Sequence, residues 1–318
     1  MSSINPISHE PSAVDTLTTD SPPTPALRGL IASALGKAPA AWHKPHTGRS
    51  AASFVVSFHD GSTAFVKSAV DDQSASQIRT EHEVISTVRS DLVARELAWL
   101  DDGERPVLVI EDLSSAHWPA DHDPVSWKPG QFDLMFAALN RVAELPPPSS
   151  LPLAPSASAH YWPLIAEDVE GFLSLGLCSS RWFSAAVDGL AAAERDADLG
   201  GEALVHNDVR SDNLCFLGQR VVFVDWAQAF RGNPEYDVAT AASTLPLEGG
   251  PDPFDVLPDG GHWAAFSAGR CVFRALHETD APDWFRRVLQ RIAVICLSWA
   301  SRSLDLPRWD GPTWNQIR

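Results

Sequence analysis

The sequence predicts an α+β protein in two lobes, a small N-terminal lobe of strands with a helix and a larger, mainly helical C-terminal lobe. One observation is a hairpin pattern near the start, where the apolar segments 53–58 and 63–67 flank an Asp-Gly turn. Another is the helical spacing of apolar residues that dominates from residue 130 onward. A β-rich patch at 203–226 interrupts these helical segments.

The other elements follow from the spacing of apolar residues and from turn signals. In the N-terminal lobe we expect helices over 26–40 and 76–90 and a strand over 105–113. In the C-terminal lobe the clearest helical patterns cover 132–145, 180–197 and 283–304. Within the β-rich patch, a strand over 203–208 precedes a hairpin over 213–226 that turns at Gly218-Gln219.

These patterns divide the chain into three parts. Residues 1–25 are polar and rich in proline, so a disordered tail is expected there. Residues 26–112 form the N-terminal lobe, and residues 113–318 form the C-terminal lobe. Because a cleft between two lobes is a preferred place for a ligand, the functional site is expected at their boundary.

The composition of the chain argues against several classes of function and site. The net charge of −17 argues against a nucleic-acid partner; it fits either attraction of a cationic substrate or simple solubility. No apolar run approaches the roughly 18 residues of a membrane helix, and the N-terminus has no secretory pattern, so the expected location is the cytoplasm. The four cysteines form no CxxC pair, which favours buried free thiols over a zinc site or disulfides. The oligomeric state stays open.

The segment VHNDVRSDN (205–213) carries the chemistry, together with Asp225 at the end of the next hairpin. A carboxylate at Asp208 can accept the proton of a hydroxyl and align its oxygen for attack. Asn213 and Asp225 supply the hard oxygen ligands that Mg²⁺ prefers, and a hairpin between them would bring them together. The alternative is a surface loop rich in the turn residues Asp and Asn.

A second cluster lies in the N-terminal lobe. Lys67 is one of only four lysines, and it ends an apolar strand. A lysine on a strand, held by a glutamate on the next helix, can direct its ammonium at phosphates. Glu81 is the expected partner, with Glu83 as the alternative; separately, each could be a solvated residue on its element.

These motifs, with VFVDW (222–226) and GNPEYDVA (232–239), resemble the aminoglycoside phosphotransferase family, which belongs to the protein-kinase-like superfamily with choline kinases. The resemblance covers residues 28 to at least 245. It implies a bilobal protein-kinase-like fold and an ATP-dependent enzyme that phosphorylates a small molecule. It also implies that Asp208 is the catalytic base and that Asn213 and Asp225 hold Mg²⁺.

The resemblance assigns further residues to ATP. Lys67 would contact the α- and β-phosphates and Glu81 would orient it. Ser50 lies in the place of the nucleotide loop (46–53), which has one glycine where the family has several. The backbone near Glu111 and Leu113 would bind adenine. A second departure is Asn207, where the family commonly has glycine. Asp237 is expected to cap a helix near Val238 and to brace the catalytic loop.

The sequence says less about the molecule that accepts the phosphoryl group. Several tryptophans and acidic residues of the C-terminal lobe suggest a hydroxyl-bearing, cationic or sugar-like acceptor, such as an amino sugar or an aminoglycoside antibiotic, in resistance or in primary metabolism. For most of the tryptophans, packing in the core is the favoured alternative. The acidic candidates are Glu167, Asp168, Glu170, Glu248, Asp252 and Asp255, each of which could instead be solvated surface. Two other functions remain: a protein kinase, disfavoured because DFG and APE strings are absent, and a catalytically silent nucleotide-binding module.

Overall fold

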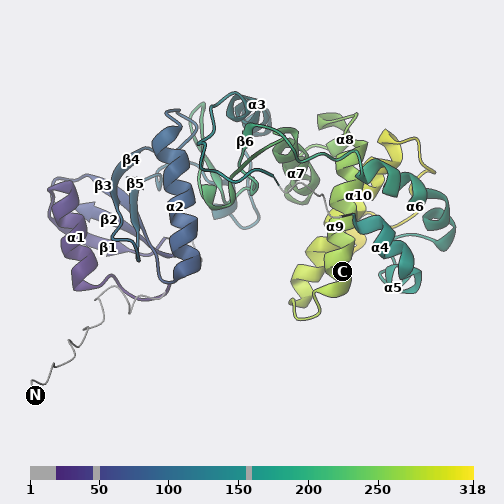
Figure 1. The fold of residues 1–318 in the computed structure, drawn as a ribbon, viewed down its shortest axis with the longest axis horizontal. Coiled ribbons are helices and arrows are strands. Elements are labelled where there is room, and N and C mark those ends of the chain that lie inside the picture. The colour runs from purple at the N-terminus through teal and green to yellow at the C-terminus, as the bar shows by residue number, and fades with distance from the viewer. Residues whose placement is uncertain (1–18, 46–50, 155–159) are drawn as a thin grey trace, which may run out of the picture. The chain divides into compact units, whose positions relative to one another are not determined.

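The computed structural model describes residues 19–45, 51–154 and 160–318, which form two compact units. The first unit comprises Met1–His117 and Cys215–Gln228, and the second comprises Trp118–Leu214 and Ala229–Arg318. The segment Cys215–Gln228 therefore packs with chain that precedes it by about a hundred residues. Figure 1 shows the elements of both units. The predicted tail falls mostly outside the described residues.

The first unit is built on a five-stranded antiparallel sheet of order β1-β2-β3-β5-β4. Its elements are α1 (Pro25–Leu35), β1 (Pro39–His43), β2 (Ala52–Phe58), β3 (Thr63–Ser68), α2 (Asp72–Thr87), β4 (Glu96–Leu100) and β5 (Val107–Glu111). The hairpin strands β7 (Leu214–Leu217) and β8 (Arg220–Phe223) and the short turn η2 (Trp226–Gln228) follow later in the chain.

Two helices cover opposite faces of this sheet, as Figure 1 shows. Leu27 and Ile31 of α1 pack with Ala64 and Val66 of β3 in one buried core. Because successive side chains of a strand point to opposite faces, Lys67 projects from β3 toward the other face, where α2 lies. A reciprocal pair of hydrogen bonds between Asp71 and Ser74 starts α2.

The second unit is mainly helical. Its helices are α3 (Gln131–Ala143), α4 (Tyr161–Glu167), α5 (Val169–Ser174), α6 (Ser180–Glu194), α7 (Glu235–Thr244), α8 (Pro253–Val256), α9 (Gly261–His277) and α10 (Asp283–Ser303). Short 3₁₀ turns are η1 (Pro119–Asp121), η3 (Leu245–Glu248) and η4 (Trp314–Gln316). Strands β6 (Ala203–Val205) and β9 (Phe230–Gly232) form a two-stranded antiparallel sheet.

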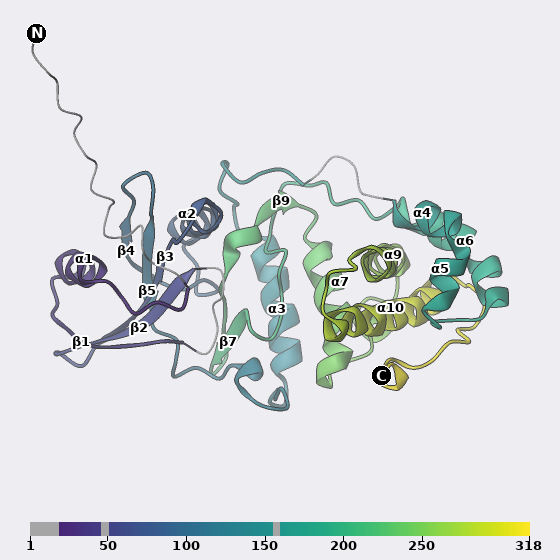
Figure 2. The same cartoon turned by 90° about the horizontal axis from the view of Figure 1, so that it is seen from below.

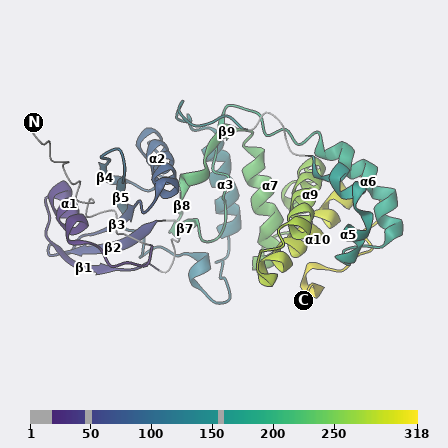
Figure 3. The same ribbon diagram turned by 60° about the horizontal axis from the view of Figure 1, so that its bottom comes forward.

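The α9–α10 pair forms the centre of the second unit. Figures 2 and 3 show α9 and α10 side by side, with α4, α5 and α6 at one end. Their buried faces join one core that contains Trp162, Trp182, Trp263 and Trp299. These tryptophans pack in the interior, so they are not free to stack on a ligand.

The predicted α+β class is confirmed, and the elements predicted over 53–58, 63–67, 132–145 and 283–304 lie within a few residues of β2, β3, α3 and α10. Cys215, Cys271 and Cys296 are buried free thiols, as expected, and Cys178 is half-buried. Among the described residues, no helix combines the length and the apolar character that a membrane span requires.

Candidate active site

Lys67 and Glu81 meet where α2 packs on the sheet. The Nζ atom of Lys67 lies 2.6 Å from Oε2 of Glu81, and only 14% of the Lys67 side chain and 1% of the Glu81 side chain are exposed. Glu81, rather than the alternative partner Glu83, points from the buried side of α2. A shielded ammonium on a strand is thus held by a carboxylate on a helix.

Asp225 joins this cluster from the segment that follows β8. Its Oδ1 lies 3.4 Å from Nζ of Lys67, and its backbone N–H donates to Oε1 of Glu81 at 3.1 Å. Asp225 has a φ of 63°, in the left-handed region that residues other than glycine, asparagine and aspartate seldom adopt. Unfavourable backbone geometry at a clustered carboxylate is a pattern typical of functional sites.

The charge balance of this cluster keeps Lys67 ionised. Burial acts to lower the pKa of Lys67, because it disfavours the charged form, but the carboxylates of Glu81 and Asp225 outweigh burial and raise the pKa above its ordinary value. At neutral pH the site therefore presents a fixed ammonium, which suits an anionic ligand such as a phosphate.

Glu111 and Leu113 lie at the end of β5 and just beyond it. The Glu111 carboxylate accepts hydrogen bonds from the Arg220 guanidinium at 2.7 Å and from the Arg95 backbone N–H at 2.9 Å. The Glu111 side chain therefore ties β8 to the sheet, so that a contact with a ligand would fall to the backbone. The Leu113 side chain is buried. Ser50 lies outside the described residues.

Asp208 and Asn213 meet within the second unit. The Nδ2 atom of Asn213 donates to the backbone oxygen of Asp208 at 2.9 Å and to its Oδ2 at 2.8 Å. Asn213 is only 6% exposed, so its rotamer is fixed by packing and by these bonds. Because Nδ2 is committed to Asp208, the amide oxygen of Asn213 is the atom that remains to face a ligand.

A buried carboxylate braces the segment that leads into this loop. Oδ2 and Oδ1 of Asp237 accept hydrogen bonds from the backbone N–H groups of His206, at 2.6 Å, and of Asn207, at 2.8 Å. The predicted bracing role is thus matched by contacts. The predicted cap is wrong, because α7 begins at Glu235 and places Asp237 inside its first turn, after the N-cap Pro234.

The backbone at Asn207 explains its departure from the family pattern. Its φ is 67°, a value that glycine adopts freely and that asparagine tolerates better than most residues. The next N–H, that of Asp208, donates to Nδ1 of His206 at 3.3 Å. His206 is fully buried, so it holds the turn rather than meeting a substrate.

Glu248 is joined to the same loop by a hydroxyl. Its carboxylate accepts from Oγ of Ser211 at 2.8 Å and from the indole N–H of Trp127 at 3.0 Å. Both donors are neutral, and within the described ranges no cation pairs with Glu248 at the salt-bridge distances found elsewhere in the chain. The loop of Asp208 therefore has a half-buried negative charge beside it.

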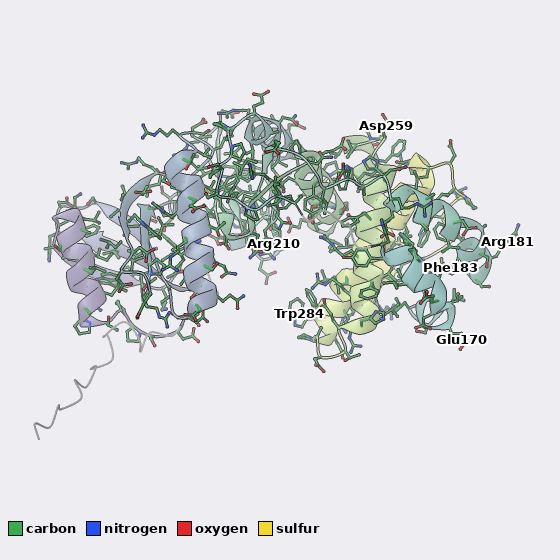
Figure 4. The ribbon with its side chains drawn as sticks, in the orientation of Figure 1. Glu170, Arg181, Phe183, Arg210, Asp259 and Trp284 are labelled. Carbon is green, nitrogen blue, oxygen red and sulfur yellow. The ribbon has the colours of Figure 1, made fainter. Side chains whose placement is uncertain are left out.

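The other acidic candidates have structural or exposed positions. The Asp168 and Asp252 side chains cap the N-termini of α5 and α8, and Asp252 also pairs with Arg302 at 2.8 Å. Figure 4 shows Glu170 at the far end of the second unit from Arg210, which belongs to the loop of Asp208. Glu248, by contrast, accepts a hydrogen bond from Ser211 of this loop.

Sequence reasoning missed two contacts of the loop. Arg210 places Nε 3.4 Å from Oδ1 of Asp208 and its terminal nitrogen 3.0 Å from Oδ2 of Asp212. The signal for this contact was present, since an arginine stands two residues after the candidate base. The link from Ser211 to Glu248 joins positions 37 residues apart, and no local pattern indicates it.

Comparisons with known proteins identify the family and the fold of this chain. The model of the phosphotransferase enzyme family matches residues 42–276. No curated protein sequence matches the chain significantly. Among solved structures, the macrolide 2′-phosphotransferase MphH from Brachybacterium faecium is 14% identical, with a TM-score of 0.52 and coverage of 84% of this chain and 96% of that one. A choline/ethanolamine kinase family protein from Mesorhizobium loti is 15% identical, with a TM-score of 0.51 and coverage of 84% and 92%.

At such identities the two structures show a shared fold, which confirms the predicted protein-kinase-like class. The family match extends from β1 to the end of α9. It includes the described residues that the sequence analysis assigned to the nucleotide, to the metal ion and to the catalytic base. Since this match covers well over half of the chain, the protein belongs to the phosphotransferase enzyme family and is an enzyme that phosphorylates a hydroxyl group of a small molecule.

Proposed function

We propose that this enzyme transfers the γ-phosphoryl group of ATP to a hydroxyl of a small cationic or sugar-like molecule, such as an amino sugar or an aminoglycoside. The observation that carries the proposal is the contact between Asp208 and Asn213 in one loop, at 2.8 Å. This contact supports the proposal, because it joins a carboxylate that can accept a proton to an amide whose oxygen can bind a metal ion.

Asp208 is the proposed base. The acceptor hydroxyl gives its proton to the Asp208 carboxylate while its oxygen attacks the γ-phosphorus. The bond between that phosphorus and the β-bridging oxygen breaks, and ADP leaves with the electron pair. The hydrogen bond from Asn213 fixes one carboxylate oxygen, Oδ2, so that Oδ1 is the better placed acceptor.

The residues fit a magnesium ion. Mg²⁺ takes oxygen ligands and is commonly held by one or two protein side chains together with substrate phosphates. The Asp225 carboxylate and the amide oxygen of Asn213 are such ligands. When bound, the ion neutralises charge on the β- and γ-phosphates. That Asn213 and Asp225 share one ion stays a prediction.

Lys67 and the end of β5 are proposed to hold the nucleotide. The ammonium of Lys67, kept charged by Glu81, suits the α- and β-phosphates. The backbone near Glu111 and Leu113 is proposed to meet adenine, and Ser50 to lie in the loop over the phosphates. The Glu111 carboxylate is engaged with Arg220, so this contact depends on main-chain groups alone.

Glu248 supports a cationic acceptor. A half-buried carboxylate whose described partners are neutral donors attracts a positive charge, because it has no cation to compensate it. Its position within one hydrogen bond of Ser211 sets it near Asp208 along the loop. The indole of Trp127 adds a ring beside it, and cations favour such rings.

The proposal is tested by measuring ADP release with ATP and Mg²⁺ against a panel of kanamycin, glucosamine, choline, erythromycin and glucose. We expect magnesium-dependent release with at least one cationic member, and weaker release with glucose. Tight binding of MgATP without turnover on any member would instead support a silent nucleotide-binding module.

A further inference from the structure

The loop of the proposed base carries a cation that the roles assigned so far do not use. Arg210 lies two residues after Asp208, and its Nε atom is 3.4 Å from Oδ1 of Asp208. Oδ1 is the carboxylate oxygen proposed above as the proton acceptor, since Asn213 donates to Oδ2. The guanidinium therefore lies on the side of Asp208 where the acceptor hydroxyl has to approach.

The ion pairs of the Arg210 guanidinium contribute little to the stability of the fold. Its side chain is 53% exposed, and those of Asp208 and Asp212 are 34% and 39% exposed. Ion pairs in such surroundings contribute little to folding. Its closer partner is Asp212, at 3.0 Å, so the contact with Asp208 is loose and the guanidinium can turn to another anion.

The neighbouring arginine has a different position. Arg220 is the other arginine between Ala203 and Trp226, and it is fixed by Glu111 at 2.7 Å and by the Asp91 carbonyl at 2.8 Å. Arg220 holds strands together, whereas Arg210 keeps several N–H donors in the open beside the base. A planar guanidinium with paired donors matches the oxygens of a phosphoryl group.

We propose that Arg210 is a catalytic residue that donates hydrogen bonds to the γ-phosphoryl group during its transfer, with Asp212 as its partner before ATP binds. This rests on the proposed function. Arg210 makes and breaks no covalent bond: the phosphoryl group moves from ADP to the acceptor oxygen, and the proton goes to Asp208. Arg210 offsets the negative charge of the three phosphoryl oxygens, which otherwise repels the approach to Asp208.

The test uses a mimic of the transferring group, so that it needs no identified acceptor. Calorimetry measures the affinity of the full chain for MgADP alone and for MgADP with tetrafluoroaluminate. The variants are Arg210→Ala and Arg210→Lys. Arg181→Ala is the matched control, because Arg181 is an exposed arginine on α6 of the same unit, as Figure 4 shows.

In the wild type and in Arg181→Ala, we expect fluoroaluminate to strengthen ADP binding by about 10²-fold or more. Arg210→Ala should lose most of this gain and keep the affinity for MgADP alone, while Arg210→Lys should keep part of it. An undiminished gain in Arg210→Ala, or no gain in a wild type that binds MgADP, overturns the inference and leaves nucleotide use intact. A wild type that binds no magnesium nucleotide overturns the proposed function instead.

Discussion

Oδ2 of Asp237 accepts a hydrogen bond from the backbone N–H of His206 at 2.6 Å, from inside the first turn of α7. The other oxygen of the same carboxylate accepts from Asn207. One buried side chain thereby fixes the two residues that precede the proposed base. The position of Asp208 therefore depends on the protonation state of Asp237, a group that touches no substrate.

The stability of the protein should fall as pH rises through the titration of Asp237. Burial raises the pKa of Asp237 from 3.8 to about 7, against the opposing hydrogen bonds of the loop. The folded chain therefore binds this proton more tightly than the unfolded chain, and between about pH 4 and pH 7 the free energy of unfolding falls, by up to roughly 4 kcal/mol. Urea unfolding at a series of pH values measures this slope.

Asp237→Asn should remove that slope, because asparagine does not titrate. It should also weaken the brace, since the amide has one accepting oxygen for two N–H donors. Asp188→Asn, at an exposed position of α6, is the matched control and should keep the slope of the wild type. A stability difference between wild type and Asp237→Asn that is constant from pH 4 to pH 8 would rule out titration of this carboxylate.

The Lys67–Glu81 pair should behave as a buried ion pair. Lys67→Met should lower the free energy of unfolding by about 3–5 kcal/mol, because it leaves the Glu81 charge uncompensated. Glu81→Gln should also destabilise, and the double variant should lose less than the sum of the two. Urea unfolding of all four proteins gives the coupling free energy. Each single variant should also bind MgATP more weakly.

The surface pair of Lys37 and Asp60 provides the control for this cycle. Its two side chains are 41% and 50% exposed at a separation of 2.9 Å. Lys37→Met should therefore change neither stability nor nucleotide affinity measurably. If Lys67→Met changes the free energy of unfolding as little as Lys37→Met does, then Lys67 is a strand-end residue whose ammonium group lies in solvent. That is the alternative interpretation of its position in the sequence.

Short sequence patterns predicted the elements whose ends are set by turn residues. The Asp-Gly turn and the alternating strands on either side of it gave β2 and β3, and the expected turn at Gly218 has a φ of 64°. The helix expected over 26–40 ends at Leu35, because Gly36 takes a φ of 64° and stops it. The strand β1 that follows was not predicted.

Elements whose buried residues are small, or that are only half-buried, were harder to predict. Helix α9 was not predicted, because its buried face includes small residues such as Gly261, Ser267 and Gly269, which weaken the apolar pattern of an amphipathic helix. Strand β4 is short and half-buried throughout. The candidate residues of the catalytic loop were found because they lie in short motifs. The contacts of Glu248 with Ser211 and Trp127 join positions far apart in the chain, so that only tertiary structure creates them.

Glu248 should set the preference for a charged amine. Glu248→Gln keeps the acceptor oxygen for Ser211 or Trp127 but removes the negative charge. With the amine-bearing acceptor that the ADP-release panel identifies, we expect the preference for the free amine over its N-acetylated form, as a ratio of kcat/KM, to fall by about tenfold, which corresponds to roughly 1.4 kcal/mol. Glu167→Gln, on an exposed position of α4, should leave this ratio unchanged. An unaltered ratio in Glu248→Gln would place the amine elsewhere.

Asp208 should be required for transfer but not for nucleotide binding. Asp208→Asn preserves the size of the side chain and an oxygen that can accept the 2.8 Å hydrogen bond from Asn213, but it cannot take up a proton. We expect kcat with the same acceptor to fall by about 10²–10⁴-fold, with the affinity for MgATP within about threefold of the wild type.

Asp208→Ala should lose transfer completely, since it also frees Asn213, and Asp188→Asn should retain wild-type turnover. Wild-type turnover in Asp208→Asn, with a loss only in Asp208→Ala, would mean that this carboxylate positions Asn213 and that the proton goes to another group.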